Sequence, residues 1–188
     1  NVTPNHLDVH KGMEEYVSAK ENIFLGQGKG DLLVCNLDND LSAAMAPKAP
    51  GKVRTFSRRE KVESGAWFEN DTIYYNGTPW ITREDIRIPG LHNVENYMAA
   101  ICAAADYIRP ETALQVARQF AGVEHRIEFV RQLHGVKYYN DAIATSPARA
   151  IAGLHSFDQK LIVIAGGYDK KIPFDAYGEE ACRHVKLL

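Results

Sequence analysis

Apolar positions along the chain switch between helical and strand-like spacing, and this predicts an α/β protein. Residues 13–24 place apolar side chains at helical intervals, whereas residues 32–35 form a short apolar run typical of a strand. The same criteria predict a short helix that begins at Thr3-Pro4 and further helices over residues 37–45, 92–107, 110–120, 147–157 and from about 174. Further strands are expected over residues 53–56, 67–75, 79–81, 127–133, 136–139 and 161–165.

Two stretches indicate what kind of sheets these strands form. Residues 67–81 contain Asn76-Gly77 between strand-like runs, which predicts a type I′ hairpin turn within a small antiparallel insert. Leu161 to Ala165 is apolar throughout and lies between expected helices. Such a run is typical of a parallel sheet that is covered on both faces.

The pattern changes at Gly122, where two helices give way to two strands joined at His134-Gly135. We therefore predict two domains, residues 1–121 and residues 122–188. The chain opens on a helix-start signal at Thr3-Pro4 and closes where an apolar strand begins. We expect it to be a piece of a longer protein.

Composition and charge narrow the function classes. Of 188 residues, 45% are hydrophobic and 24% are charged, with a net charge of −2, so neither nucleic acid nor an anionic membrane is indicated as a partner. The 3 cysteines are widely spaced and lack CxxC pairs, which argues against a disulfide framework or a zinc site. No apolar run reaches the length of about 20 residues that spans a bilayer. We expect a cytoplasmic protein.

The first group of candidate residues lies near the start. His6 and His10 are four residues apart, so on a helix they share a face, and Asp8 between them would add a carboxylate for a divalent metal ion. Lys20 lies on the next helix. Paired surface histidines and a solvated lysine explain the same residues, and the pattern alone favours that explanation.

The second group opens the helix that follows Pro89-Gly90. Asn93 and Asn96 are three residues apart and project from one face of its first turn. Amide side chains beside free backbone N–H groups can bind a base edge or lie near phosphates. The alternative is that Asn93 is simply the N-cap of the helix.

Polar residues near the predicted boundary form the third group. Arg126 is a planar, permanently charged donor at a domain junction, where nucleotides often bind, although it also fits an ordinary strand arginine paired with a glutamate. Asp141 follows a strand and precedes a helix, so it belongs at the carboxyl edge of a sheet, where α/β proteins bind ligands. A turn with Ser146 as N-cap explains Ser146 but leaves Asp141 unexplained.

Glycines and lysines follow the apolar strand 161–165. Gly166-Gly167 permits close backbone approach, and Lys170 or Lys171 can meet an anionic group. A tight turn alone requires the glycines, so only the lysines point to a ligand.

The order of these motifs resembles the muramoyl-peptide ligase family along essentially the whole chain. The matching strings are Asn1-x-x-x-x-His6-Leu-Asp-x-His10, Tyr16-x-x-Ala-Lys20, Pro89-Gly90-x-His92-Asn93-x-x-Asn96, His125-Arg126 and Asn140-Asp141. The resemblance implies the later part of a central ATPase-type domain followed by the start of a Rossmann-like domain that brings the amino acid. It also implies ATP-dependent amide formation through an acyl phosphate.

The resemblance assigns roles to individual residues. It implies that His6 is a magnesium ligand and that Lys20 carries a carbamate supporting Mg²⁺. Asn93 and Asn96 resemble nucleotide-site residues. Arg126 and Asp141 resemble residues that contact ATP from across the boundary.

The stretch from Asp141 to Pro147 resembles the branch of the family that adds D-glutamate to UDP-N-acetylmuramoyl-L-alanine. In that branch Thr145 and Lys170 match positions that hold the carboxylates of the amino acid, whereas Ala142 and Ile143 depart from the common Ser-Lys form. Two other possibilities stay open: a related ligase for another amino acid, including a folylpolyglutamate type, and a non-catalytic nucleotide-binding module. The chain contains no Gly-x-x-x-x-Gly-Lys-Ser/Thr phosphate loop, so we expect it to be inactive without the missing domains of its parent chain.

Overall fold

The computed structural model describes residues 1–4, 9–168 and 172–188, and the chain divides into two compact units. Unit 1 comprises residues 1–87 and 92–120, and unit 2 comprises residues 88–91 and 121–188. The division after residue 120 lies beside the predicted boundary. The helix expected at Thr3-Pro4 extends into residues 5–8, which lie outside the described part of the chain.

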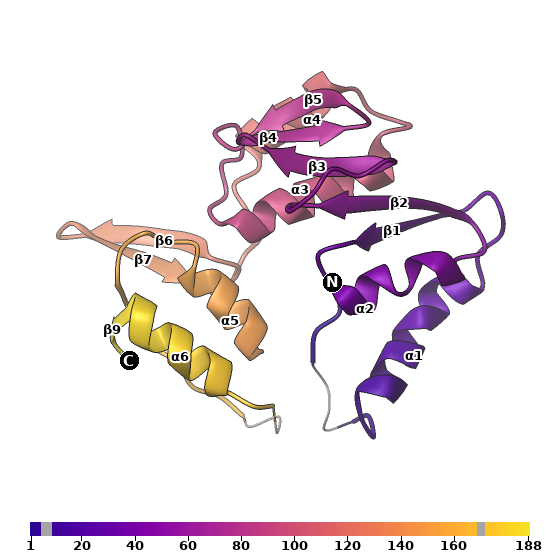
Figure 1. Ribbon diagram of the computed structural model, residues 1–188. Coiled ribbons are helices and arrows are strands. Elements are labelled where there is room, and N and C mark those ends of the chain that lie inside the picture. The colour runs from indigo at the N-terminus through magenta and orange to yellow at the C-terminus, as the bar shows by residue number, and fades with distance from the viewer. Residues whose placement is uncertain (5–8, 169–171) are drawn as a thin grey trace. The chain divides into compact units, whose positions relative to one another are not determined.

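Unit 1 is built on one mixed sheet with the strand order β1-β2-β3-β4-β5 (Figure 1). The strands are β1 (Leu32–Asn36), β2 (Lys52–Ser57), β3 (Gly65–Glu69), β4 (Thr72–Tyr75) and β5 (Thr78–Thr82). β1, β2 and β3 pair in parallel, and β3, β4 and β5 pair antiparallel. The predicted antiparallel strands are therefore present, but they extend the same sheet as β1 and β2 instead of forming a separate insert.

Two tight turns shape this meander. The predicted strand over residues 67–75 is divided at Asn70 and Asp71, whose φ angles of 48° and 55° reverse the chain. Asn76 and Gly77 have φ angles of 46° and 85°, as the predicted type I′ turn requires at both central positions. Asparagine, aspartate and glycine tolerate this left-handed region better than other residues do, which explains the positions of both turns.

The helices of unit 1 agree with the apolar spacing except at one place. They are α1 (Met13–Leu25), α2 (Asp40–Ala43), the 3₁₀ helix η1 (Ala46–Lys48), α3 (Leu91–Ala104) and α4 (Pro110–Gln119). The helix expected over residues 37–45 is much shorter, because Asn39 caps it by accepting a hydrogen bond from the N–H of Ser42 at 2.9 Å. Pro47 then limits the following turn.

The core of unit 1 lies between α3 and the sheet. α3 buries Val94, Met98, Ile101 and Cys102 completely or nearly so. Its contact with β2 is direct, because a guanidinium nitrogen of Arg54 donates to the carbonyl of Cys102 at 2.8 Å. Burial of each such apolar side chain contributes about 1.5–3 kcal/mol, so this helix anchors the sheet.

Unit 2 contains two small sheets and two helices, and the two helices contact each other (Figure 1). Its elements are β6 (Glu128–Leu133), β7 (Val136–Asn140), α5 (Pro147–Leu154), β8 (Leu161–Ile162), α6 (Asp175–His184) and β9 (Val185–Leu187). β6 and β7 form the predicted hairpin, with His134 and Gly135 at its turn. β8 and β9 are parallel, as expected for this part of the chain.

The apolar run 161–165 differs from its prediction in length and burial. Only Leu161 and Ile162 form a strand, and Ile162 and Ile164 are 59% and 100% exposed. Within the described residues β8 has a single strand neighbour, so the expected covering of both sheet faces is not present. Apolar composition alone therefore predicted a longer and more buried strand than the structure has.

We expect Gly65 to be one of the least replaceable residues of unit 1. Its φ is +134°, and a Cβ atom there would lie 1.8 Å from the carbonyl oxygen of Thr55 on β2. Gly65→Ala should lower the free energy of unfolding by an amount near the upper end of single substitutions, about 4–5 kcal/mol. Urea unfolding of the purified variant measures this loss.

The matched control is Gly77→Ala. Gly77 also has a positive φ of +85°, but a Cβ atom there would meet nothing within 4 Å. This variant should lose only the cost of the left-handed backbone, about 1–2 kcal/mol. Equal losses in the two variants would contradict the role of the close approach at Gly65.

Candidate functional site

The structure describes six of the eight predicted site residues. Lys20, Asn93 and Asn96 lie in unit 1, while the other three lie in unit 2. The two predicted residues His6 and Lys170 fall outside the described part of the chain. Each unit therefore carries its own part of the candidate site.

Asn93 and Asn96 interact with each other in the first turn of α3. The side-chain amide of Asn96 donates to Oδ1 of Asn93 at 3.0 Å. Asn93 is buried, with 6% exposed, whereas Asn96 is exposed. Because α3 begins at Leu91, Asn93 is its third residue, and the alternative that it serves as the N-cap is wrong. The buried amide orients the exposed one, which can reach a ligand.

A polar cluster that sequence reasoning missed surrounds the carboxyl ends of β1 and β2. Asp38 follows β1, and its carboxylate accepts from the hydroxyl of Ser57 at 2.6 Å and from the N–H of Arg58 at 2.7 Å. Oδ1 of the buried Asn36 accepts from the N–H of Asp38 at 2.8 Å. These bonds fix the two strand ends side by side, at the edge where parallel sheets bind ligands.

Glu95 joins this cluster to α3. Its carboxylate accepts from Nε of Arg58 at 3.1 Å and from the side-chain amide of Asn1 at 3.3 Å. The Glu95 side chain is only 16% exposed, so this is a partly buried ion pair. The helix turn that carries Asn93 and Asn96 is thereby tied to the end of β2. The available signal was the position of Asn36 and Asp38 directly after an apolar strand.

Lys20 does not occupy the environment expected of a carbamylated lysine. It is exposed on α1, and its ammonium lies 5.3 Å from the ring centroid of Tyr16. Carbamylation requires the neutral amine, which burial would favour. Among the residues described here, nothing buries Lys20, and its carbamylation in the intact protein stays a prediction.

In unit 2, the turn that carries Arg126 is bound to the end of β7. Oδ1 of Asp141 accepts from the N–H of Ile127 at 3.1 Å, and the side-chain amide of Asn140 lies 2.8 Å from Nδ1 of His125. The carbonyl of His125 also accepts from the N–H of Ile143 at 3.3 Å. Arg126 and Asp141 therefore lie on turns that are bonded to each other, and their predicted contact with ATP stays a prediction.

The same turn holds an unfavourable backbone conformation. His125 and Ile127 have φ angles of 64° and 46°, and for a β-branched residue such as Ile127 this is a real outlier. Strain of this kind costs about 1–3 kcal/mol and persists where surrounding contacts impose it. Here the N–H of Ile127 donates to Asp141, and the side-chain amide of Asn140 lies against the ring of His125, so contacts on both sides of Arg126 hold this conformation.

The electrostatics of Asp141 reflect two opposing effects. Burial raises the pKa of the Asp141 carboxyl above its usual value, while the N–H of Ile127 and the charges of Arg126 and Arg149 act to lower that pKa. A Cβ atom on Gly153 of α5 would lie 2.8 Å from Oδ2 of Asp141, so glycine at this position lets α5 approach the carboxylate closely.

Thr145 and Ser146 complete the strand-to-helix turn. Thr145 is exposed, and its N–H donates to the carbonyl of Ile143 at 2.9 Å. Ser146 is the N-cap of α5, as the alternative reading of this turn expected, although its side chain makes no capping hydrogen bond. The hydroxyl of Thr145 is thus accessible at the start of α5.

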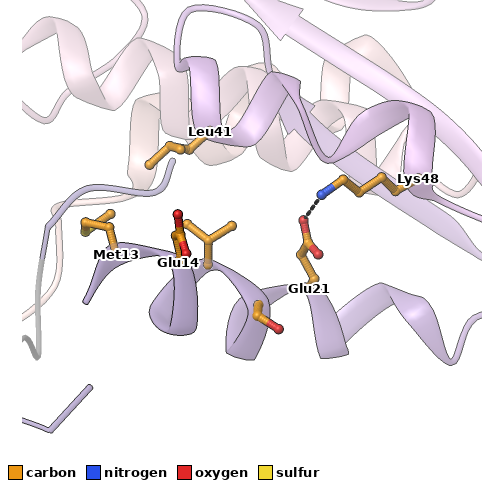
Figure 2. Close-up of a pocket in the computed structure, with 7 residues that line it drawn as sticks. Met13, Glu14, Glu21, Leu41 and Lys48 are labelled. Carbon is orange, nitrogen blue, oxygen red and sulfur yellow. Dashed lines mark hydrogen bonds and ion pairs between the residues drawn. The ribbon is translucent and has the colours of Figure 1, made fainter. Parts of the chain in front are cut away.

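A hollow of about 310 Å³ lies elsewhere in unit 1, between α1 and the α2–η1 segment (Figure 2). The residues that line it are Met13, Glu14, Val17, Ser18, Glu21, Leu41 and Lys48. An ion pair of 2.5 Å between Lys48 and Glu21 closes one side of it. It contains none of the predicted site residues, so it is not the candidate site.

No helix in the described parts of the chain is long and apolar enough to cross a membrane.

Known proteins resemble this chain in sequence. Residues 1–104 match the family model described as the Mur ligase middle domain. The UDP-N-acetylmuramoylalanine–D-glutamate ligases of Clostridium kluyveri and Acetivibrio thermocellus are 52% and 53% identical to it over 188 and 192 residues. Each alignment covers 100% of this chain and 41% of the relative. The chain therefore spans about two fifths of the length of these curated relatives.

Solved structures share the fold at low sequence identity. The UDP-N-acetylmuramoylalanyl-D-glutamyl-2,6-diaminopimelate–D-alanyl-D-alanyl ligase from Acinetobacter baumannii aligns with a TM-score of 0.62 and 18% identity, over 82% of this chain and 35% of that chain. A UDP-N-acetylmuramoyl-L-alanyl-D-glutamate–2,6-diaminopimelate ligase aligns with a TM-score of 0.57 and 18% identity, over 94% of this chain and 40% of that chain. These likenesses concern the fold alone.

The raised pKa of Asp141 predicts a pH-dependent contribution to stability. The folded chain binds the Asp141 proton more tightly than the unfolded chain, so this group lowers the free energy of unfolding as pH rises above the usual aspartate pKa of about 3.9. Asp141→Asn can still accept from Ile127 but does not titrate. Urea unfolding between about pH 4 and pH 7 should show the variant gaining stability relative to the original chain as pH rises.

Asp158→Asn is the control for this prediction, because Asp158 is an exposed aspartate in the same unit. The two variants should differ in how their stability depends on pH. Parallel pH profiles, or a relative loss of stability by Asp141→Asn as pH rises, would contradict the proposed burial effect.

Proposed function

Since the chain belongs to the Mur ligase family, we propose that the longer protein containing it adds D-glutamate to UDP-N-acetylmuramoyl-L-alanine. The observation that carries this proposal is identity of about one half along the entire chain with ligases named for D-glutamate. Both the nucleotide-side motifs of unit 1 and the strand-to-helix turn of unit 2 lie within that alignment. An enzyme of peptidoglycan precursor synthesis therefore accounts for both units.

The proposed reaction forms an amide at the expense of ATP. ATP supplies the phosphoryl group that converts the carboxylate of UDP-N-acetylmuramoyl-L-alanine into an acyl phosphate. The amine of D-glutamate then attacks the activated carbonyl, and phosphate leaves as the amide forms. The residues of this chain serve to bind and orient the three substrates.

The residues proposed for ATP have suitable chemistry. Asn96 presents an exposed amide that its hydrogen bond to Asn93 orients, which suits a base edge or a phosphate oxygen. Arg126 presents an exposed guanidinium, and Asp141 and its neighbours hold the turn on which it lies. Guanidinium groups suit phosphate because they offer several donors in a planar fork.

Magnesium requires ligands that the amine form of Lys20 does not provide. Mg²⁺ prefers oxygen ligands and carries several waters, whereas an ammonium group repels it. We propose His6 as a ligand and Lys20 as a carbamate, which would supply oxygen. Because Lys20 is exposed within this chain, the burial that favours carbamylation has to come from other parts of the parent protein. If the full-length Lys20→Ala variant keeps full activity, the assignment of Lys20 as the carbamate is wrong.

The cysteines support a proposal about the compartment in which the protein acts. Cys35, Cys102 and Cys182 are all free, and burial raises the pKa of the Cys102 thiol to about 11. Unpaired thiols are typical of proteins in a reducing compartment. We therefore propose that the protein acts in the bacterial cytoplasm.

The direct test is an amide-forming assay of the full-length protein. UDP-N-acetylmuramoyl-L-alanine and ATP are supplied with a panel of amino acids, and release of phosphate and formation of the amide product are both measured. We expect product with D-glutamate and none with L-glutamate, D-alanine or diamino acids. Product with another amino acid would assign the chain to a related ligase, and no product with any would favour a non-catalytic nucleotide-binding module.

Lys170 and Thr145 are proposed to bind the carboxylates of D-glutamate, and Lys170 gives the sharper test. Loss of a charge-assisted hydrogen bond costs about 1.5–3 kcal/mol, so Lys170→Ala should raise the KM for D-glutamate about 10- to 150-fold. The KM for ATP should stay unchanged. Lys171→Ala is the matched control; if it raises the KM for D-glutamate while Lys170→Ala does not, the role belongs to Lys171.

A further inference from the structure

A cluster of metal-ligating side chains joins α5 and α6, and none of its members takes part in the proposed reaction. His155 directly follows α5, while Glu180 and His184 lie one turn apart on α6. Oε2 of Glu180 lies 2.6 Å from Nε2 of His155 and 3.3 Å from Nε2 of His184. Of the residues that the structure describes, these form the one set of three potential ligands whose atoms lie within 4.8 Å of one another.

The carboxylate of Glu180 is fixed so that one oxygen faces both histidines. Its other oxygen, Oε1, accepts from a guanidinium nitrogen of Arg183 at 2.7 Å. A charged carboxylate and neutral imidazoles are the forms of these side chains that bind a cation.

We propose that His155, Glu180 and His184 bind a divalent transition-metal ion of the zinc type. Two imidazoles and one carboxylate are a ligand set that zinc uses, with water in the fourth position. Magnesium prefers oxygen ligands, so this set selects against the ion proposed for the ligase reaction. The site is independent of the proposed function.

The distances from Glu180 to the two histidines are close to those that this ion requires. Zinc–ligand bonds of about 2.0–2.2 Å in a tetrahedron place neighbouring ligand atoms about 3.3 Å apart. The distance from Glu180 to His184 is already 3.3 Å. His155 and Glu180, now 2.6 Å apart, have to separate by less than about 1 Å, and both imidazoles are partly exposed, so rotation of the side chains accomplishes this.

The arrangement around the site suggests what the ion does. Arg183 orients the ligating carboxylate from the side away from the histidines, as an outer-shell partner does in known metal sites. α6 leads directly into β9, the partner of β8. A bound ion would therefore hold the end of α5 against α6 and order the strand that follows. The competing explanation is a surface ion-pair cluster without metal.

The test uses the full-length protein with excess Mg²⁺, which occupies oxygen-rich sites. Zn²⁺ binding is measured by competition with a chromophoric chelator, and backbone hydrogen exchange of α6 is followed with and without Zn²⁺. We expect one Zn²⁺ per chain and slower exchange across α6. His155→Asn, His184→Asn and Glu180→Gln should each weaken binding at least 10-fold, because even loss of an outer-shell partner typically costs 10- to 100-fold.

His134→Asn is the matched control. His134 is an exposed histidine in the β6–β7 turn with a φ of 47°, a conformation that asparagine tolerates, so this variant should fold and bind Zn²⁺ as before. Circular dichroism confirms that the ligand variants remain folded. Equal Zn²⁺ affinity in the ligand variants and the control, or unchanged hydrogen exchange in α6, would overturn the proposal and leave an ion-pair cluster.

Discussion

The close contact between β2 and β3 at Gly65 is the constraint on which unit 1 depends. A side chain at this position would collide with the carbonyl of Thr55, so the strands approach only because glycine has no Cβ atom. At β3 the sheet changes from parallel to antiparallel pairing. The parallel half ends in the polar cluster of Asp38 and Arg58, and the antiparallel half extends the surface on which helices pack. Glycine at position 65 thus allows one sheet to carry both the polar cluster and the surface on which helices pack.

The sequence predicted which helices and strands are present better than it predicted where they begin and end. The long segments α1, α3 and α4 are all present, and in α3 the apolar spacing matches the buried positions Val94, Met98 and Ile101. The prediction failed for α2, where a single cap at Asn39 decides where the helix begins. It also failed at Ile164, because apolar composition does not reveal whether a neighbouring strand exists to bury a side chain.

The candidate site shows a similar division. Asn96, Arg126 and Asp141 could be named as candidates because they belong to short motifs whose order along the chain is distinctive. Glu95 was not, because nothing local distinguishes it from a solvated helix glutamate. Its contact with Arg58 joins residues 37 positions apart, and such a pairing exists only after the sheet and α3 have assembled.

Ile127 illustrates a conflict between the stability of the fold and the role proposed for Arg126. Its left-handed backbone opposes the preference of a β-branched residue, so the native turn stores conformational energy beside Arg126. Replacing Ile127 with glycine or asparagine would relax the backbone and also release the restraint that aims the guanidinium. In laboratory evolution, stabilising substitutions should therefore accumulate elsewhere in unit 2. Selection for activity should retain the strained backbone of this turn.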